Sequence, residues 1–319
     1  MNWNYVVRRV LMMIPVLIGV SILGFSMMQL APGGFTALYT LNPNTSAEDI
    51  ERIKRAWGLD RPMHVQYLTW ARRMLTGDWG NSFRGGANVR DLIVERIPAT
   101  VQLMGTALAI AIILGFVIGA LGAYRQYSIF DYLATTGALI ALSIPTFWFG
   151  LMVIYIFAER LGWIPSGGSE SLRAGETGFL DRLHHLVAPA LVLALVLTAQ
   201  WSRYFRSAFL EVIHQDYIRT AHAKGLPSGL VLRRHALRNA LLPLIALAGM
   251  QLPVLFGGAL VTESVFGWAG MGRLFLDALT FRDFPVVMAM LMVTSFLVIL
   301  GNLIADIALS IIDPRIRFN

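Results

Sequence analysis

The chain of 319 residues is 56% hydrophobic and only 14% charged, which makes it too apolar for an ordinary soluble domain. Its net charge of +7 does not indicate a nucleic-acid partner, because the basic residues stand at the ends of apolar runs rather than on one amphipathic face. Cysteine is absent, which excludes a disulfide framework and a thiolate metal site. These values predict an all-α protein that crosses a lipid membrane several times.

Six apolar stretches are long enough to cross a bilayer as helices, which takes about 20 residues each. The first is too long for the apolar core of a signal peptide, so we expect it to be retained as an anchor. The predicted spans are Val10–Leu30, Ala99–Ala123, Tyr132–Ala158, Leu186–Phe205, Ala240–Thr262 and Phe284–Leu309.

The distribution of basic residues predicts that both termini are cytoplasmic. With that orientation, most of the arginines near the spans lie on the inner side, as the positive-inside rule requires. The inner residues are Arg8, Arg9, Arg125, Arg203, Arg206, Arg219, Lys224, Arg233, Arg234, Arg238, Arg315 and Arg317.

Three units follow from this topology. Residues 1–30 hold the N-terminus and first span, and residues 31–98 form a small helical segment on the outer side. Residues 99–319 hold the other five spans and a long cytoplasmic loop at 203–239. The outer segment is too small to bury a core of its own, so we interpret it as a cap on the membrane bundle.

Within the outer segment, a capping box at Ser46 and Asp49 predicts a helix that Gly58 ends. A second helical run covers Val65–Leu75. In the spans, small residues at Gly115, Gly119 and Gly122 predict a close helix contact, within this bundle in preference to a partner subunit.

Pro145 and Pro253 lie inside predicted spans, where we expect each of them to kink its helix.

The sequence lacks the motifs of an enzyme. No His-Glu-x-x-His and no Gly-x-Ser-x-Gly pattern is present, so we predict neither catalytic residues nor a metal site. A phosphate-binding loop needs Gly-Lys followed by Ser or Thr, whereas the lysines are Lys54, after Ile53, and Lys224, after Ala223. The chain therefore does not hydrolyse nucleotide itself.

Charged residues inside the spans are few. Glu263 closes the outer end of the fifth predicted span, and Asp306 lies toward the inner end of the last one. Because Asp306 is near an interface, we predict that it pairs with Arg315 or Arg317 rather than serving a proton path.

The loop at 203–239 has the features of a docking element. Asp216 is predicted to cap a short helix over Tyr217–Lys224, which Gly225 ends with a left-handed residue. The small side chains of Ala221 and Ala223 keep that helix slim enough to lie in a cleft of a partner protein. A solvated basic loop without a partner is the alternative interpretation.

This loop is similar to the cytoplasmic motif of ATP-binding-cassette (ABC) importer permeases, whose general form is Glu-Ala-Ala, three residues, Gly. Arg219, Thr220, Ala221 and Gly225 occupy those positions, so the usual glutamate is missing. The longer string that continues with Leu226 resembles the peptide/nickel subfamily.

Further motifs along nearly the whole chain resemble the B-type, or first, permease of dipeptide and oligopeptide importers. They are Gly58–Pro62, Gly77–Phe83, Glu95–Thr100, Ser143–Trp148, Gly162–Pro165, Thr262–Phe266 and Arg282–Pro285. The chain departs from the family at Pro32–Phe35, where Pro-Gly-Asp-Pro is usual, and at Ala269, where proline often stands.

The resemblance implies a type I ABC importer permease fold in a bacterial inner membrane. It also implies a homologous C-type permease, two cytosolic ATPase subunits that bind ATP and Mg, and an extracytoplasmic binding protein that delivers peptides. No cofactor is expected in this chain.

The resemblance assigns the contact with the ATPases to the loop and leaves the transport path open. Gln102, Met250 and Gln251 are candidates to line that path, although helix packing explains them equally well. The predicted ATPase-coupling residues are Asp216, Tyr217, Arg219, Thr220, Ala221, Ala223, Lys224, Gly225 and Leu226.

Two other functions compete with the importer subunit. An ion-coupled secondary carrier needs midplane charges or repeated halves with broken helices, and neither stands out in the sequence. An intramembrane enzyme needs the nucleophile or metal constellation that is missing.

Overall fold

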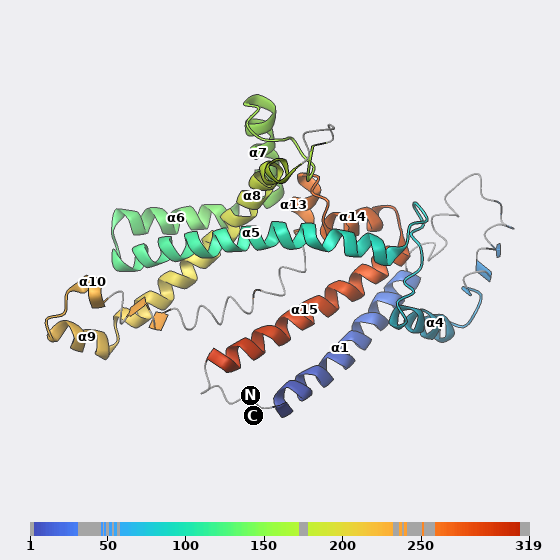
Figure 1. Ribbon diagram of the computed structural model, residues 1–319, viewed down its shortest axis with the longest axis horizontal. Coiled ribbons are helices and arrows are strands. Elements are labelled where there is room, and N and C mark those ends of the chain that lie inside the picture. Colours follow the sequence, from blue (N-terminus) through green and yellow to red (C-terminus); the bar gives the residue numbers. More distant parts are fainter. Residues whose placement is uncertain are drawn as a thin grey trace.

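The computed structural model describes residues 3–30, 46, 48, 51–52, 54–55, 58–171, 178–231, 236–237, 239–240, 251 and 259–312. Over these residues the regular structure is helical, apart from an isolated bridge between Asn81 and Asn88. The predicted all-α class is therefore confirmed (Figure 1). The elements are α1 (Trp3–Leu30), α4 (Met63–Leu75), α5 (Val89–Tyr124), α6 (Ile129–Ser143), α7 (Thr146–Val153), η2 (Ile154–Arg160), α8 (Phe179–Ile213), α9 (Asp216–Ala223), α10 (Ser228–Val231), α13 (Leu260–Val265), α14 (Met271–Thr280) and α15 (Phe284–Ile312).

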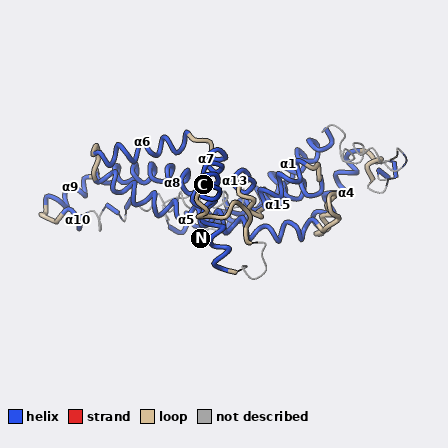
Figure 2. The backbone as a smooth tube through the Cα atoms, turned by 90° about the horizontal axis from the view of Figure 1, so that it is seen from above, coloured by secondary structure: helices blue, strands red, loops and turns tan. Residues whose placement is uncertain are grey.

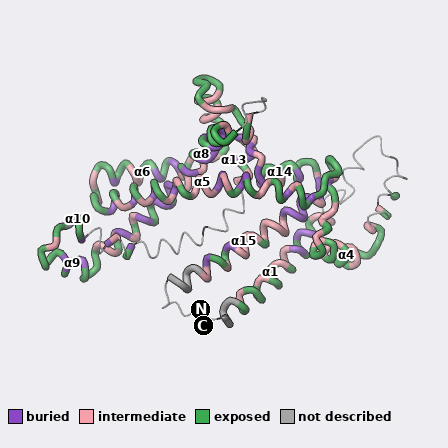
Figure 3. Tube along the Cα trace, viewed as in Figure 1, coloured by how far each residue is buried: buried purple, intermediate pink, exposed green. Residues whose placement is uncertain are grey.

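The long helices α5 and α8 cross each other and form the centre of the bundle (Figure 1). Glycines on α5 make the crossing close: a Cβ on Gly115 would lie 2.6 Å from the Trp201 Cβ, and one on Gly119 would lie 2.6 Å from the Phe205 Cβ. Trp201 and Phe205 are buried in this contact. Figure 3 shows buried segments where α5 and α8 cross. The glycine pattern therefore serves packing within the chain, as predicted.

Helices α1 and α15 form a second, antiparallel pair. Gly24 of α1 contacts the side chain of Leu291 on α15. Near the other end of the pair, Arg9 forms a salt bridge with Asp306 across 3.0 Å. The structure thus gives Asp306 the partner Arg9, which the sequence did not indicate. The predicted partners Arg315 and Arg317 lie outside the described residues, so that pairing stays a prediction.

The predicted span Tyr132–Ala158 is two helical pieces rather than one. Helix α6 ends at Ser143, α7 begins after Pro145, and the two segments Ile129–Ser143 and Thr146–Arg160 are bent by 98°. Proline causes the break because it has no N–H for the preceding turn and disfavours a helical residue before it. The expected kink at Pro145 is confirmed, and the bend is far sharper than an ordinary kink.

Four of the described helices are long and apolar enough to cross a membrane, and a fifth crossing is possible if the bent pair counts as one. They contain the predicted spans at Val10–Leu30, Ala99–Ala123, Leu186–Phe205 and Phe284–Leu309. Most of the remaining predicted span, Ala240–Thr262, lies outside the described residues.

Two predicted boundaries differ from the structure. Helix α5 begins at Val89, inside the segment predicted as an outer cap, because Asn88 caps the N–H groups of Arg90 and Asp91. Helix α8 continues to Ile213, so the first residues of the predicted loop 203–239 are helical.

The predicted helix stop at Gly58 is confirmed, with Gly58 at φ +67°. The predicted run Val65–Leu75 is α4, which starts two residues earlier at Met63. Other predictions fall on residues outside the described ranges, namely those on Pro32–Phe35, Asp49, Arg233, Arg234, Arg238, Met250 and Pro253.

Helices α9 and α10 lie at the opposite end of the molecule from α4. Both views place α9 and α10 at one end, beyond α8, and α4 at the other end, beside the end of α1 (Figures 1 and 2). Tyr67 and Trp70 of α4 pack against Phe25 of α1. We refer to the α9 end as the inner end and to the α4 end as the outer end, following the predicted orientation.

Candidate coupling surface and transport path

Helix α9 lies directly beyond the inner end of α8, separated from it by His214 and Gln215 only. It spans Asp216–Ala223, one residue earlier at each end than predicted. Gln215 is the N-cap residue, and no side chain caps the helix. The predicted capping role of Asp216 is therefore wrong: its side chain is 97% exposed and lies 3.6 Å from Arg219.

One face of α9 is buried against its own chain. Ile218 and Ala221 are 3% and 6% exposed and form a small core with Val231 and Ala236. Val212, Ile213 and Leu226 pack against this core. Of the predicted coupling residues, Ala221 and Leu226 thus contribute to holding α9 on the end of α8.

The opposite face of α9 is exposed to solvent and basic. The residues on it that were predicted to contact a partner keep their side chains free of the loop core. They are Tyr217, Arg219, Thr220, Ala223 and Lys224, and His222 lies among them. Because its other face is buried against the chain, α9 can move as a rigid body together with a partner that binds the exposed face.

Gly225 ends α9 with a left-handed backbone. Its φ is +77°, and a Cβ built on it would meet nothing within 4 Å. The N–H of Leu226 donates to the carbonyl of Ala221, five residues back, which is the pattern of a glycine-terminated helix. The predicted role of Gly225 as the end of the helix is confirmed, and the position favours glycine because of its backbone angle rather than for lack of space.

Two of the three candidate path residues lie in the described part of the chain. Gln102 is half-buried on α5, and Gln251 is half-buried in a turn. Met250 lies outside the described residues. The geometry therefore does not define a path through these side chains.

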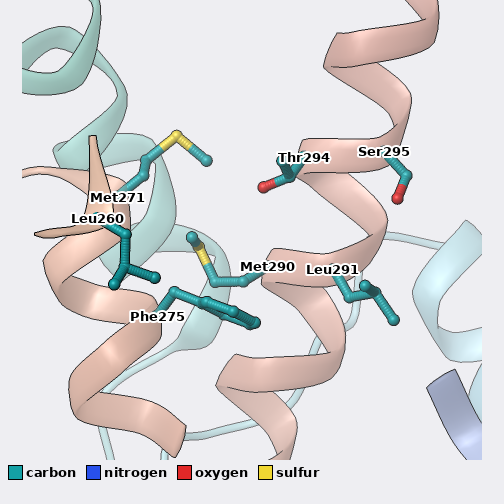
Figure 4. Close-up of a pocket in the computed structure, with 8 residues that line it drawn as sticks. Leu260, Met271, Phe275, Met290, Leu291, Thr294 and Ser295 are labelled. Atoms are coloured by element: carbon teal, nitrogen blue, oxygen red, sulfur yellow. The ribbon is translucent and has the colours of Figure 1, made fainter. Parts of the chain in front are cut away.

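A small cavity lies between α14 and α15, where residues of the two helices face each other (Figure 4). Its volume is about 200 Å³. Ligand pockets usually measure about 300–1,000 Å³, so this recess is smaller than a typical ligand pocket. Its lining residues are Leu260, Met271, Gly272, Phe275, Met290, Leu291, Thr294 and Ser295.

A buried polar network joins α5 to α13 and α14 at the outer end. Glu263 is fully buried, and its carboxylate accepts hydrogen bonds from the Thr100 hydroxyl at 2.8 Å and the Arg273 backbone N–H at 3.0 Å. Thr100 in turn accepts a hydrogen bond from the Met271 N–H at 2.7 Å. The carboxylate also lies at the start of α14, where the helix dipole favours a negative charge.

A second polar contact joins the outer loop to the start of α15. Asp283 is buried and accepts hydrogen bonds from the Ser82 hydroxyl and from the Phe83 N–H at 3.1 Å. Nearby, hydrogen bonds from the Arg73 guanidinium and the Gly80 N–H hold the pKa of the Asp78 carboxyl below its usual range. The loop is thus fixed to the start of α15 through Asp283 and to the end of α4 through Asp78.

These contacts explain motifs that the sequence presents separately. Thr100 and Glu263 belong to the motifs Glu95–Thr100 and Thr262–Phe266, and Ser82 and Asp283 belong to Gly77–Phe83 and Arg282–Pro285. The structure pairs each motif with its counterpart more than 160 residues away. Sequence reasoning missed the pairings because no local pattern indicates which distant residue a buried threonine or serine will meet.

A comparison with solved structures supports the helical architecture. The fold is similar to that of a chain described as "Crystal structure of an amino acid ABC transporter with histidines", with a TM-score of 0.53 and 17% identity. The match covers 69% of this chain and 93% of that chain. At this identity the likeness defines the fold only.

Family models cover almost the whole chain. Residues 96–318 match the binding-protein-dependent transport system inner membrane component, and residues 2–104 match the N-terminal part of such membrane components. The chain therefore belongs to this family of inner-membrane transport proteins.

Relatives that are similar along their full length carry more specific names. The "Oligopeptide transport system permease protein AppB" of Bacillus subtilis (strain 168) is 46% identical over 98% of this chain and 99% of its own. The "Dipeptide transport system permease protein DppB" of Alkalihalophilus pseudofirmus is 38% identical over the same shares of the two chains. The suspected relationship to B-type permeases of peptide importers is confirmed.

Proposed function

We propose that this chain is a permease subunit of an ABC importer and forms half of the path by which peptides enter the cell. The observation that carries the proposal is the exposed basic face of α9, held on the end of α8 by a buried core. That arrangement suits a docking helix that transfers force from a partner to a membrane helix. The names of the relatives, which share 36–46% identity along the chain, support peptides as the cargo.

The proposed topology has six membrane-spanning helices. The described helices supply five of them if α6, α7 and η2 cross together, and the apolar stretch at 240–262 supplies the sixth. Residues 31–88 then lie on the outer side as a helical cap, because α5 begins at Val89, and both termini lie in the cytoplasm of a bacterial cell. The bias of arginine toward the inner segments supports this orientation.

The proposed partners follow from the family. A homologous C-type permease completes the path as a heterodimer, two cytosolic ATPases dock on the coupling helices, and an extracytoplasmic binding protein delivers the cargo. ATP and Mg bind to the ATPases, and this chain acts as a non-catalytic subunit. The absence of a Gly-Lys-Ser/Thr motif from the sequence supports this division of labour.

The proposed mechanism is alternating access by rigid-body motion. When the ATPases close around ATP, they displace α9, and α8 moves with it because Ile218 and Ala221 pack against the loop core. Each ligand shifts the balance between the inward-open and outward-open states by its differential affinity for the two. Gln102, Met250 and Gln251 remain the proposed lining residues, since uncharged side chains suit cargo of variable composition.

The contact with the ATPases is proposed to use the exposed face of α9. That face carries Tyr217, Arg219, Thr220, Ala223 and Lys224, and Gly225 ends the helix. Asp216 contributes a carboxylate at the start of the helix, where the helix dipole favours a negative charge. Ala221 and Leu226 act from below by fixing the helix to α8.

The test compares two substitutions at Gly225. Asparagine and aspartate have nearly the same shape and both tolerate a left-handed backbone, so only the charge differs between them. We expect Gly225→Asn to retain uptake driven by ATP, whereas Gly225→Asp leaves the complex in the membrane but uncouples ATP hydrolysis from uptake. The added carboxylate would have to be desolvated at the docked surface.

The measurement is peptide uptake per ATP hydrolysed by the complete importer in proteoliposomes. Full cargo accumulation by the Gly225→Asp complex would rule out the docking role of α9.

A further inference from the structure

A buried ion pair joins α6 to α8 near the inner end of the bundle. The Arg206 guanidinium donates two hydrogen bonds to the Asp131 carboxylate, from Nε to Oδ1 at 2.6 Å and from Nη2 to Oδ2 at 2.8 Å. Asp131 is 3% exposed, although its partner reaches the surface. Two parallel hydrogen bonds fix both the distance and the relative orientation of the helices that carry them.

The same carboxylate organises the turn that connects α5 to α6. Its Oδ2 accepts a hydrogen bond from the Tyr127 N–H at 3.0 Å, and Tyr127 has a left-handed φ of +64°. The Ser128 hydroxyl accepts a hydrogen bond from the Asp131 N–H at 3.3 Å and caps α6. Asp131 therefore holds both the turn before it and the helix that it begins.

Helix α5 closes the third side of the ion pair. A Cβ on Gly122 would lie 3.2 Å from Oδ1 of Asp131 and 3.7 Å from Cδ of Arg206. The backbone of α5 thus lies directly against the pair, and three helices meet at one polar contact.

Arg206 stands two turns before the end of α8, and this end is continuous with the coupling helix. Val212 and Ile213 of α8 pack against Ile218 and Ala221 of α9, across a connection of two residues. A displacement of α9 therefore carries the inner end of α8, and Arg206 with it.

The buried apolar contact between α6 and α8 is made mainly by small side chains. The buried residues of this contact are Ala138 and Ala141 against Ala199, with Leu142 packed beside them, while Ile129 and Leu133 are 80% and 68% exposed. Each alanine side chain buries only a small apolar area. The ion pair adds a bidentate contact that fixes the orientation of α6 relative to α8.

We infer that Asp131 and Arg206 are positioning residues for transport: they transmit the movement of α9 and α8 to α6, so that α6 and the inner end of α8 move as one body. Through the sharp bend at Pro145, the motion of α6 then reaches α7. This inference rests on the proposed function, because it takes α9 as the point where force enters the chain.

The first test is a double-mutant cycle in the complete importer, reconstituted in proteoliposomes. We expect Asp131→Asn and Arg206→Gln each to lower peptide uptake per ATP hydrolysed by about tenfold, within the usual range of coupling between sites. In the double variant, uptake per ATP hydrolysed should be no lower than in either single variant. The double variant removes both charges, so no uncompensated charge is left. Asp277→Asn, at an exposed position on α14, is the matched control and should behave as wild type.

The second test measures the movement itself. The natural chain has no cysteine, so spin labels at Leu133→Cys on α6 and Glu211→Cys on α8 can be placed without other changes to this subunit. The separation of the labels is compared between the nucleotide-free importer and the importer trapped with an ATP analogue. We expect the separation to be the same in both states of the otherwise wild-type chain and to differ between states once Asp131→Asn is added.

A label separation that changes between states in the wild-type background would overturn the inference, even if Asp131→Asn failed to assemble. So would an assembled Asp131→Asn complex with full uptake per ATP. Failure of the proposed function looks different, because then the wild-type complex would not couple ATP hydrolysis to peptide uptake at all.

Discussion

At the scale of single residues, Glu263 illustrates how a charged group is accommodated inside this bundle. Its carboxylate lies where α14 begins, and Gly270 and Gly272 leave room for it: a Cβ on Gly270 would contact the carboxylate, and one on Gly272 would lie 3.0 Å from its Oε2. Two hydrogen bonds compensate the buried oxygens. Satisfied buried polar groups of this kind specify one arrangement of helices, because any shift leaves a donor or acceptor unpaired.

Thr100 provides the direct test of this network. Thr100→Val keeps the shape of the side chain but removes the hydroxyl, which leaves the Glu263 carboxylate and the Met271 N–H each short of one partner. We expect a loss of about 1–3 kcal/mol in stability for each group left unpaired. Thermal unfolding of the purified protein in detergent measures the effect.

Thr100→Ser is the matched control, since it keeps the hydroxyl and loses only a methyl group. Equal unfolding temperatures for the valine and serine variants would contradict the assigned role of the hydroxyl.

At the scale of helices, the crossing of α5 and α8 decides where α9, the proposed coupling helix, stands. A Cβ on Gly119 would lie 2.6 Å from the Ser202 carbonyl oxygen as well as from the Phe205 Cβ, so α5 cannot carry a side chain there at the present distance. Because α9 is fixed to the end of α8, any widening of the crossing changes the position of the docking surface.

Gly119→Ala should therefore force the two helices apart. We expect a loss of about 1–3 kcal/mol from overpacking and a smaller amount of folded protein in the membrane. Gly105→Ala on the same helix is the control, because nothing lies within 4 Å of a Cβ at that position. Membrane yield and unfolding temperature are measured for both variants. If Gly119→Ala matched Gly105→Ala in both measurements, the close crossing would be refuted.

Helices and their ends follow from the sequence to different degrees. The apolar runs in α1, α5, α8 and α15 are recognisable because each consists of residues that the membrane requires. The end of α9 at Gly225 is recognisable because glycine favours a left-handed backbone. The bend at Pro145 is foreseeable in position but not in size, since its angle of 98° depends on where α7 packs.

At the scale of the whole molecule, contacts between distant residues are what the sequence alone cannot provide. Asp131 and Arg206 are 75 positions apart, and each looks like an ordinary charged residue at the end of a span. The pairing of Asp306 with Arg9 was likewise missed, because the arginines next to it in the sequence were the nearer choice. Long-range pairs depend on how helices meet, which hydropathy does not record.

The polar contacts divide the molecule into an outer and an inner part. Thr100–Glu263 and Ser82–Asp283 hold the outer ends of α5, α13, α14 and α15 together. Asp131–Arg206 and the core beneath α9 hold the inner ends of α6 and α8. We interpret this division as a fixed outer frame and an inner body that responds to the ATPases.

Transport by the chain with and without its ATPases tests the account most directly. The measurement is uptake of a labelled peptide into proteoliposomes that contain either this chain alone or the complete importer with its second permease, ATPases and binding protein. We expect ATP-dependent accumulation by the complete importer and none by the chain alone. Accumulation by the chain alone, driven by an ion gradient, would contradict the account.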